Sequence, residues 1–430
     1  MIRGYRRRSI LLALGIVVVV AAFAVGRVAR ASPGGPFTGT IVVGSAPLGV
    51  VSDTRTGHAF VANADSDSVT MIDTTRGTVV RTIDVGGTPG VLAVDGRTGH
   101  TFVVTSSRTG PESVSMLDSH TGRLVRTTQV GQVAGYGTGT IAIDERRGRV
   151  IVTDDYGGRV SVLDARSGAV RRTFTAGLDP TGVAIDPRSG RAYVTDTSEN
   201  KVLVLDVARG RVLRTLPVAG SPIAVRVDAS TGRLFVTGYD AQTSVGGVAE
   251  IDGRSGRVLM GAGKASSAVV ADPRTGALYT VDVATDSVFV TTPRSPMARK
   301  VVSWGGGDTP ATAAWPRPAT VDPRTGYLFV LMDACGQRLT PSVAGCVRVI
   351  DPRAGQLVAT IPVGRAPSAL AIDGATGRVF VANSQGGSGV QAEADWVPSW
   401  LRDHLSWFLA PRATGGGSTA GTVSVFDAPP

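Results

Sequence analysis

Apolar and polar residues alternate along most of this chain in short runs, and turn-forming residues separate the runs. Alternation with a period of two is typical of half-buried β-strands, whereas one face of a helix repeats every 3.6 residues. Four such runs follow one another at Thr181–Asp186, Arg191–Thr195, Lys201–Asp206 and Arg211–Val218. We expect these four runs to form one antiparallel sheet whose strands are joined by tight turns.

The turn after the first strand of this unit contains the phrase Asp-x-x-x-Gly, which returns along the chain at intervals of 42 to 51 residues. Its eight copies begin at Asp53, Asp95, Asp144, Asp186, Asp228, Asp272, Asp322 and Asp373. An aspartate at the first position accepts backbone N–H bonds, and a glycine at the fifth supplies a left-handed residue. A repeat of 40 to 50 residues with four strands predicts the blade of a β-propeller.

The last copy of the repeat is incomplete, because the chain ends soon after its third strand at Asp427. A strand-like run without a unit of its own, Gly39–Gly44, lies near the N-terminus and can supply the missing fourth strand. We therefore predict an all-β propeller of eight four-stranded blades, with seven blades as the alternative, in which the N-terminal strand closes the last blade. Such closure removes exposed sheet edges.

One phrase on the second strands carries a resemblance to a known family. Its copies are Phe60-Val-Ala-Asn63, Tyr193-Val-Thr-Asp196, Phe235-Val-Thr-Gly238 and Phe380-Val-Ala-Asn383. They resemble the YVTN signature of extracytoplasmic β-propeller repeat proteins, a family similar to lactonase-type and surface-layer propellers. The resemblance covers residues 39–427 and implies the fold; many members have seven blades.

Residues 1–31 differ in composition from the rest of the chain. Four arginines up to Arg8 precede an uncharged apolar run, Ser9–Gly26, and Ala29-Arg30-Ala31 follows. This pattern predicts a cleaved signal peptide or a retained membrane anchor, and both place the remainder outside the cytoplasm, secreted or anchored. We divide the chain into this segment, a linker at 32–38 and a propeller at 39–430. Subtracting the segment's six arginines from the formal net charge of +10 leaves +4.

The chain has two cysteines, Cys335 and Cys346, which lie close together in one loop. In an exported protein this spacing favours a local disulfide, and two unpaired thiols are the alternative.

Departures from the repeat gather on one face of the predicted ring. Strands A to D of each blade run outward from the axis, so the A–B and C–D turns share one face, the turn face, and the B–C and D–A loops share the other, the loop face. The loop face carries the insertions, at 108–113, 132–138, 239–247, 304–318, 333–346 and 385–421. Insertions on one face of a repeat protein often mark its binding face.

Aromatic residues are concentrated in these insertions, and all five tryptophans lie there. Large rigid rings on exposed loops suit ligand or partner recognition; the alternative is that the loops pack on themselves. The candidate binding residues are Trp304, Trp315, Arg317, Trp396, Trp400, Trp407, Tyr136, Tyr156 and Tyr239. Helical spacing of apolar residues predicts an amphipathic helix at about 395–411, which caps the mouth, binds a partner or lies on a membrane surface.

The residues that end the second strands supply oxygen atoms at one rim, and Asp154, Asp196 and Asp282 are the candidates for a metal site. Calcium takes six to eight oxygen ligands, but the same residues cap turns without a metal. We expect no cofactor, with calcium as the alternative. Asp154 and Asp155, or Asp308 and Asp333, are candidate acid–base pairs. The four histidines provide neither a multi-histidine metal site nor a nucleophile–base pair.

Arginines recur in the A–B and C–D turns and ring the turn face. They are interpreted as solvated turn residues, or alternatively as a docking face for an anionic membrane or cell-wall polymer. No aromatic residues interleave with them, so nucleic acid is not indicated.

These features predict an extracytoplasmic binding or interaction scaffold that meets a ligand or protein through its loop face. The alternative is a hydrolase or lyase, lactonase-like, acting on a small extracytoplasmic substrate. A purely structural surface protein is the third reading.

Overall fold

The computed structural model describes residues 38–135, 139–229, 231–240, 245–261, 266–272, 274–282, 287–292, 295–303, 318–332, 344–384 and 420–429. In this part of the chain, no helix is long and apolar enough to cross a membrane. The expected segments 1–31 and 395–411 lie outside the described residues.

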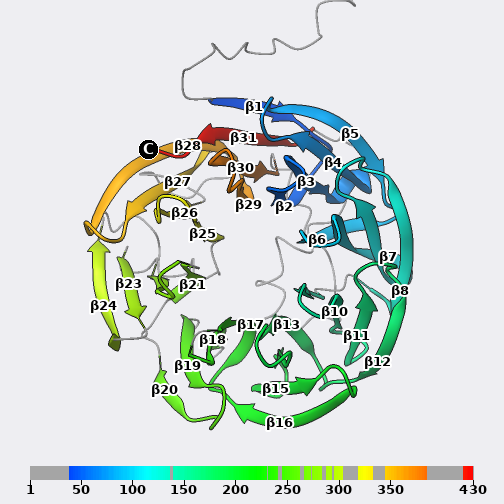
Figure 1. The fold of residues 1–430 in the computed structure, drawn as a ribbon, viewed down its shortest axis with the longest axis vertical. Coiled ribbons are helices and arrows are strands. Elements are labelled where there is room, and N and C mark those ends of the chain that lie inside the picture. Colours follow the sequence, from blue (N-terminus) through cyan, green and yellow to red (C-terminus); the bar gives the residue numbers. More distant parts are fainter. Residues whose placement is uncertain are drawn as a thin grey trace, which may run out of the picture.

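Eight small sheets are arranged in a ring around a central axis, which confirms the eight-bladed propeller (Figure 1). Within each blade the strands run antiparallel from the axis outward. Blade 1 is β2 (Pro47–Asp53), β3 (His58–Asn63), β4 (Ser68–Asp73) and β5 (Thr78–Asp84), with a short 3-10 turn η1 (Ala64–Ser66). Blade 2 is β6 (Thr88–Asp95), β7 (His100–Asp118) and β8 (Leu124–Gly135). Blade 3 is β9 (Ile141–Asp144), β10 (Arg149–Asp154), β11 (Arg159–Asp164) and β12 (Val170–Thr175). Blade 4 is β13 (Pro180–Ile185), β14 (Ala192–Asp196), β15 (Lys201–Asp206) and β16 (Arg211–Pro217).

The second half of the ring follows the same plan. Blade 5 is β17 (Ser221–Asp228), β18 (Arg233–Asp240), β19 (Val245–Asp252) and β20 (Val258–Gly261). Blade 6 is β21 (Ser266–Ala271), β22 (Leu278–Asp282), β23 (Ser287–Thr292) and β24 (Ser295–Ser303). Blade 7 is β25 (Ala319–Val321), β26 (Leu328–Met332), β27 (Ala344–Asp351) and β28 (Gln356–Arg365). Blade 8 is β29 (Pro367–Ile372), β30 (Arg378–Asn383), β31 (Thr422–Asp427) and β1 (Thr38–Val42).

The repeated turn phrase has the geometry that its residues dictate. In blade 4, the Arg188 N–H donates to Asp186 Oδ1 at 2.9 Å, and the Gly190 N–H donates to the Asp186 carbonyl at 2.8 Å. Gly190 has a φ of 71°, a left-handed conformation that glycine adopts without steric cost. The repeated aspartates and glycines are therefore structural.

The two ends of the described chain complete one blade, as predicted. β1 pairs antiparallel with β31, with Ile41 opposite Val423, and the two strands lie side by side at the ring's edge (Figure 1). The Val43 N–H extends this contact by donating to the Gly421 carbonyl at 3.0 Å. The outer strand of blade 8 thus comes from the start of the propeller, and its inner strands from the end.

The hydrophobic core is divided into clusters between neighbouring blades. One cluster joins blades 1 and 2 around Phe60 and Leu117, and another joins blades 8 and 1 around Phe380 and Ile72. The aromatic residue of the YVTN-like phrase is fully buried in both. Each blade therefore needs both neighbours to bury its two faces.

Arginines and histidines on the turn face join one blade to the next. Arg97 donates from Nε to the Glu145 carbonyl at 2.6 Å, and Arg147 donates to the carbonyls of Pro187 and Arg188 at 3.1 and 3.0 Å. His58 donates from Nδ1 to the Ser119 carbonyl at 3.1 Å. The expectation that the turn arginines are merely solvated is therefore wrong for Arg97, and Arg146 also donates to the Pro187 carbonyl, at 3.4 Å.

Blade 2 departs most from the repeat. Its second and third strands form one continuous element, β7, because residues 108–113 extend the strand instead of forming a loop. Its outer strand β8 also runs on to Gly135, and the register shifts around Pro111. In blade 7, Cys346 is buried in β27. Cys335 lies outside the described residues, so the pairing of these two cysteines stays a prediction.

Candidate functional site

The loop face is built on a contact that recurs between neighbouring blades. At several of the described blade junctions, a glycine of the D–A linker packs against the polar side chain that ends the second strand of the next blade, as Gly44 does on Asn63 and Gly364 on Asn383. A side chain at these glycines would overlap the polar group. Asn63 and Asn383, two members of the predicted rim of oxygen-bearing residues, therefore contact the linkers.

Asp196 shows how this contact satisfies a buried carboxylate. It is fully buried at the end of β14, next to Gly177 of the linker between blades 3 and 4. The Leu178 N–H donates to Oδ2 at 3.0 Å, and the N–H groups of Asp179 and Glu199 donate to Oδ1 at 3.3 Å. Burial, followed by the neighbouring Glu199, raises the pKa of Asp196. Asp196 is thus a structural anchor for the linker.

Asp154 occupies the equivalent place in blade 3, but it lacks the linker's hydrogen bond. Its Oδ1 accepts the Gly157 N–H at 2.9 Å, which matches the bond from Glu199 in blade 4. Its Oδ2 is buried and has no hydrogen-bond partner among the described residues. The linker here is the one lengthened by the insertion at 132–138, and none of its described residues donates an amide hydrogen to Asp154 Oδ2.

A second carboxylate, Glu112 of β7, lies beside Asp154. A Cβ atom added to Gly131 would lie 3.1 Å from the Glu112 Cβ and 3.5 Å from the Asp154 Cγ. Glu112 is 4 % exposed, and neither of its carboxylate oxygens has a hydrogen-bond partner in the described part of the chain. Burial, and then the charges of Asp155 and Asp154, raise the pKa of Glu112 well above its usual range.

An exposed patch lies next to this buried pair, between blades 3 and 4. Leu178 is 67 % exposed and Tyr156 is 40 % exposed. Burial and then Asp155 raise the pKa of Asp179 to about 6. Burial and the charges of Asp155 and Asp179 raise the pKa of Tyr156 to about 12. We call Tyr156, Leu178 and Asp179 the loop-face patch; it combines apolar contact area with negative charge.

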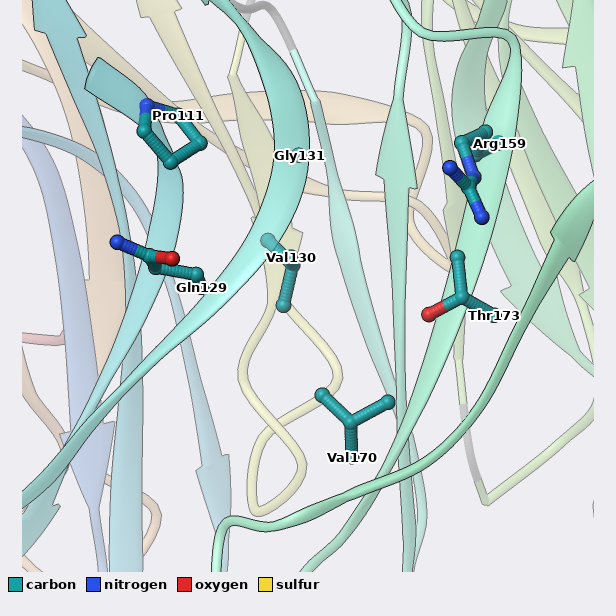
Figure 2. A pocket seen from close by; sticks show the side chains of 7 residues that line it. All are labelled: Pro111, Gln129, Val130, Gly131, Arg159, Val170 and Thr173. Atoms are coloured by element: carbon teal, nitrogen blue, oxygen red, sulfur yellow. The ribbon is translucent and has the colours of Figure 1, made fainter.

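A cavity of about 620 Å³ opens between blades 2 and 3 on the outer side of Gly131. Figure 2 shows Pro111, Gln129 and Val130 on one wall and Arg159, Thr173 and Val170 on the other. The Arg159 Nε is buried and has no hydrogen-bond partner among the described residues. Arg159 stands opposite Asp154 in the strand register, and its guanidinium lies along the cavity wall (Figure 2).

Most candidate binding residues fall outside the part of the chain that the structure describes. Those outside are Trp304, Trp315, Arg317, Trp396, Trp400, Trp407 and Tyr136, together with Asp308 and Asp333. Tyr239 is placed at the end of β18 by its backbone, opposite Ser221 and Gly246. Tyr156 is the one candidate whose side chain is described, and it lies in the loop-face patch.

The three candidate metal ligands lie apart in different blades. Asp154 and Asp196 end the second strands of blades 3 and 4, whereas Asp282 ends that of blade 6. Within the described ranges, no three histidine, cysteine or acidic side chains come together in a group that could hold a metal ion.

Sequence reasoning missed Glu112, Leu178 and Asp179. Glu112 lies in an insertion, where no other repeat offers an aligned residue. Asp179 could have been noticed from the sequence, because it is an acidic residue directly before Pro180 in a linker, and the other repeats have no acidic residue at the equivalent position.

No family model and no curated protein sequence matches the chain. Among solved structures, BamB from Moraxella catarrhalis superposes with a TM-score of 0.52 at 16 % identity, over 92 % of this chain and 100 % of that one. The dihydro-heme d1 dehydrogenase NirN, in complex with DHE, gives 0.55 at 15 % identity, over 75 % of this chain and 67 % of that one. Hydrazine synthase from Kuenenia stuttgartiensis gives 0.48 at 16 % identity, over 79 % and 93 %. For BamB and NirN, identities this low show a shared fold and nothing more specific.

Proposed function

We propose that this protein is an extracytoplasmic binding scaffold that recognises a ligand or partner protein through its loop face. The patch of Tyr156, Leu178 and Asp179 carries the proposal. Exposed tyrosine and leucine side chains beside acidic groups are the composition of an interaction surface, in which the apolar atoms provide contact area and the charges select the partner. The acidic groups favour a partner that presents lysine or arginine.

The contrast between the two faces supports this assignment. On the turn face, side chains such as Arg147 and His58 are engaged in bonds to the neighbouring blade. Arg76 and Arg209 are exposed there, but each is paired with an aspartate of its own turn, at 2.6 and 2.8 Å. Docking of that face on an anionic membrane or wall polymer draws less support, because these contacts offset much of its positive charge.

The N-terminal segment supports the extracytoplasmic location, and the YVTN-like phrases support membership of that propeller family. A hydrolase or lyase is the alternative function. Its support is the pKa of Asp179 at about 6, which suits a general acid or base near neutral pH.

Site-specific crosslinking tests the binding role directly. A photo-crosslinking amino acid is placed at Tyr156 and, as a control on the opposite face, at the exposed Arg166, in the cells that produce the protein. We expect an adduct of defined mass from position 156 and none from 166. Leu178→Asp should abolish the adduct without changing the melting temperature, because Leu178 is exposed.

Two results would refute the scaffold proposal. One is that position 156 gives no adduct, or the same adducts as position 166. The other is that the purified protein turns over a lactone and loses this activity in Asp179→Asn while its adduct pattern stays unchanged; that outcome favours the enzyme.

A further inference from the structure

The buried side chains of Glu112 and Asp154 both lie against Gly131, and neither has a positively charged partner among the described residues. Three of their four oxygens, both from Glu112 and Oδ2 from Asp154, are buried and have no hydrogen-bond partner among the described residues. Both side chains are more than nine-tenths buried. Two unpaired carboxylates in a low-dielectric interior are strongly unfavourable unless a counter-charge or a proton neutralises them.

The next blade shows that this arrangement is particular to one junction of the ring. In blade 4 the equivalent carboxylate, Asp196, is satisfied by amides of the linker. In blade 3 the Oδ2 of Asp154 receives no such bond from the described residues, and Glu112 of blade 2 lies against the same linker glycine, Gly131. Blade 4 offers two N–H donors at its aspartate, whereas this junction offers a second carboxylate. It therefore favours a positively charged group.

Nearby cations do not fill this role. Arg159 faces the outer cavity, and neither it nor any other described arginine or lysine forms an ion pair with Glu112 or Asp154. The remaining charged neighbour is Asp155, whose negative charge adds to theirs.

Glycine backbone and oxygen atoms meet at the same junction. A Cβ atom added to Gly139 would collide with the Thr153 carbonyl oxygen and would lie 2.9 and 3.1 Å from Oε2 and Oε1 of Glu112. A Cβ atom added to Gly157 would collide with Asp154 Oδ2. Glycines on both sides therefore keep these oxygens uncovered by side chains.

We propose that Glu112 and Asp154 bind a divalent metal cation of the calcium type, which bridges blades 2 and 3. The candidate ligand atoms among the described residues are oxygens, as hard cations prefer, and calcium accepts carboxylates, carbonyl oxygens and water in irregular geometry. Two carboxylates and the Thr153 carbonyl provide the protein ligands, and water completes the six to eight oxygens.

Calorimetry on the purified full chain, stripped with EDTA and dialysed, tests this proposal with Ca²⁺ alone and with Mg²⁺ alone. We expect one Ca²⁺ per chain, and a rise in melting temperature of about 3 °C at a Ca²⁺ concentration of roughly 100 times the dissociation constant. Glu112→Gln should weaken Ca²⁺ binding at least tenfold. The control is Glu250→Gln, which alters a buried glutamate of blade 5 that is paired with Arg233; its Ca²⁺ affinity should equal that of the wild type.

Several results would overturn the proposal. One is an absence of Ca²⁺ binding by the wild type, and another is equal Ca²⁺ binding by Glu112→Gln. A third is that Glu112→Gln stabilises the metal-free protein while Ca²⁺ does not stabilise the wild type, which would mean that a proton neutralises the pair. If Glu112→Gln fails to fold by circular dichroism, Asp154→Asn is measured in its place. All readouts use the isolated protein, so they are independent of whether a partner binds the loop-face patch.

Discussion

Replacing Gly177 by alanine tests the contact on which the loop face is built. Gly177 lies in the linker between blades 3 and 4 with a φ of 96°, and its Cα faces the side chain of Asp196. An alanine Cβ would collide with Asp196 Oδ2 and would lie 3.1 Å from the Leu203 Cδ1. The linker would have to move away from the carboxylate that holds it.

Two terms determine the expected loss of stability. The left-handed conformation costs an alanine about 1–2 kcal/mol. Displacing the linker also breaks the 3.0 Å bond from the Leu178 N–H to Asp196, and a hydrogen bond to a charged group contributes about 1.5–3 kcal/mol. The sum is a loss of about 2.5–5 kcal/mol in the free energy of unfolding.

Gly232→Ala is the matched control. Gly232 has a φ of 74°, and a Cβ added there would meet nothing within 4 Å. This variant should lose only the conformational term, about 1–2 kcal/mol. Urea unfolding followed by circular dichroism measures both. Equal losses in the two variants would refute the reasoning, because they would mean that the contact with Asp196 does not hold the linker.

Three further predictions concern ring closure, blade contacts and pH. Ile41→Ala in β1 removes a side chain that is 8 % exposed and should lower the free energy of unfolding by about 2–5 kcal/mol. Val42→Ala, at a side chain that is 64 % exposed, should change it by less than about 0.5 kcal/mol. Similar melting temperatures for the two variants would contradict closure by β1. Arg147→Ala removes two hydrogen bonds to blade 4 and an ion pair with Asp144, and should lower the free energy of unfolding, measured by chemical denaturation, by roughly 2 kcal/mol. Arg166→Ala, at an exposed side chain, should change it little. Equal losses in the two variants would mean that the contact between blades contributes nothing. The pKa of Asp179 is raised from its unfolded value to about 6, so the folded state binds more protons between about pH 4 and 6 and loses stability as pH rises through that window. Melting temperatures should therefore decline less over this window in Asp179→Asn than in the wild type, and identical pH profiles would show that the carboxyl group is not perturbed.

Local patterns in the sequence were enough to predict the blades. The phrase at Asp186–Gly190 encodes its turn through a side-chain acceptor and a left-handed glycine, and both act within five residues. The strands of blade 4 accordingly start and end within one residue of their predicted positions. The closure by β1 was also predictable, because a fourth strand was missing at one end and a spare one was present at the other.

The sequence by itself determined the eight repeats, the closing strand and the face on which the repeat is interrupted, because each of these depends on a pattern within one blade. Only the tertiary structure decided how adjacent blades meet. It placed Arg97 and Arg147 in contacts between blades, bonded Asp196 to the linker that precedes its blade, and brought Asp154 and Glu112 against the same glycine, Gly131. Glu112 and Asp154 are 42 residues apart in the chain. Whether such groups touch depends on the register of two sheets and the length of one linker, and no local pattern encodes these.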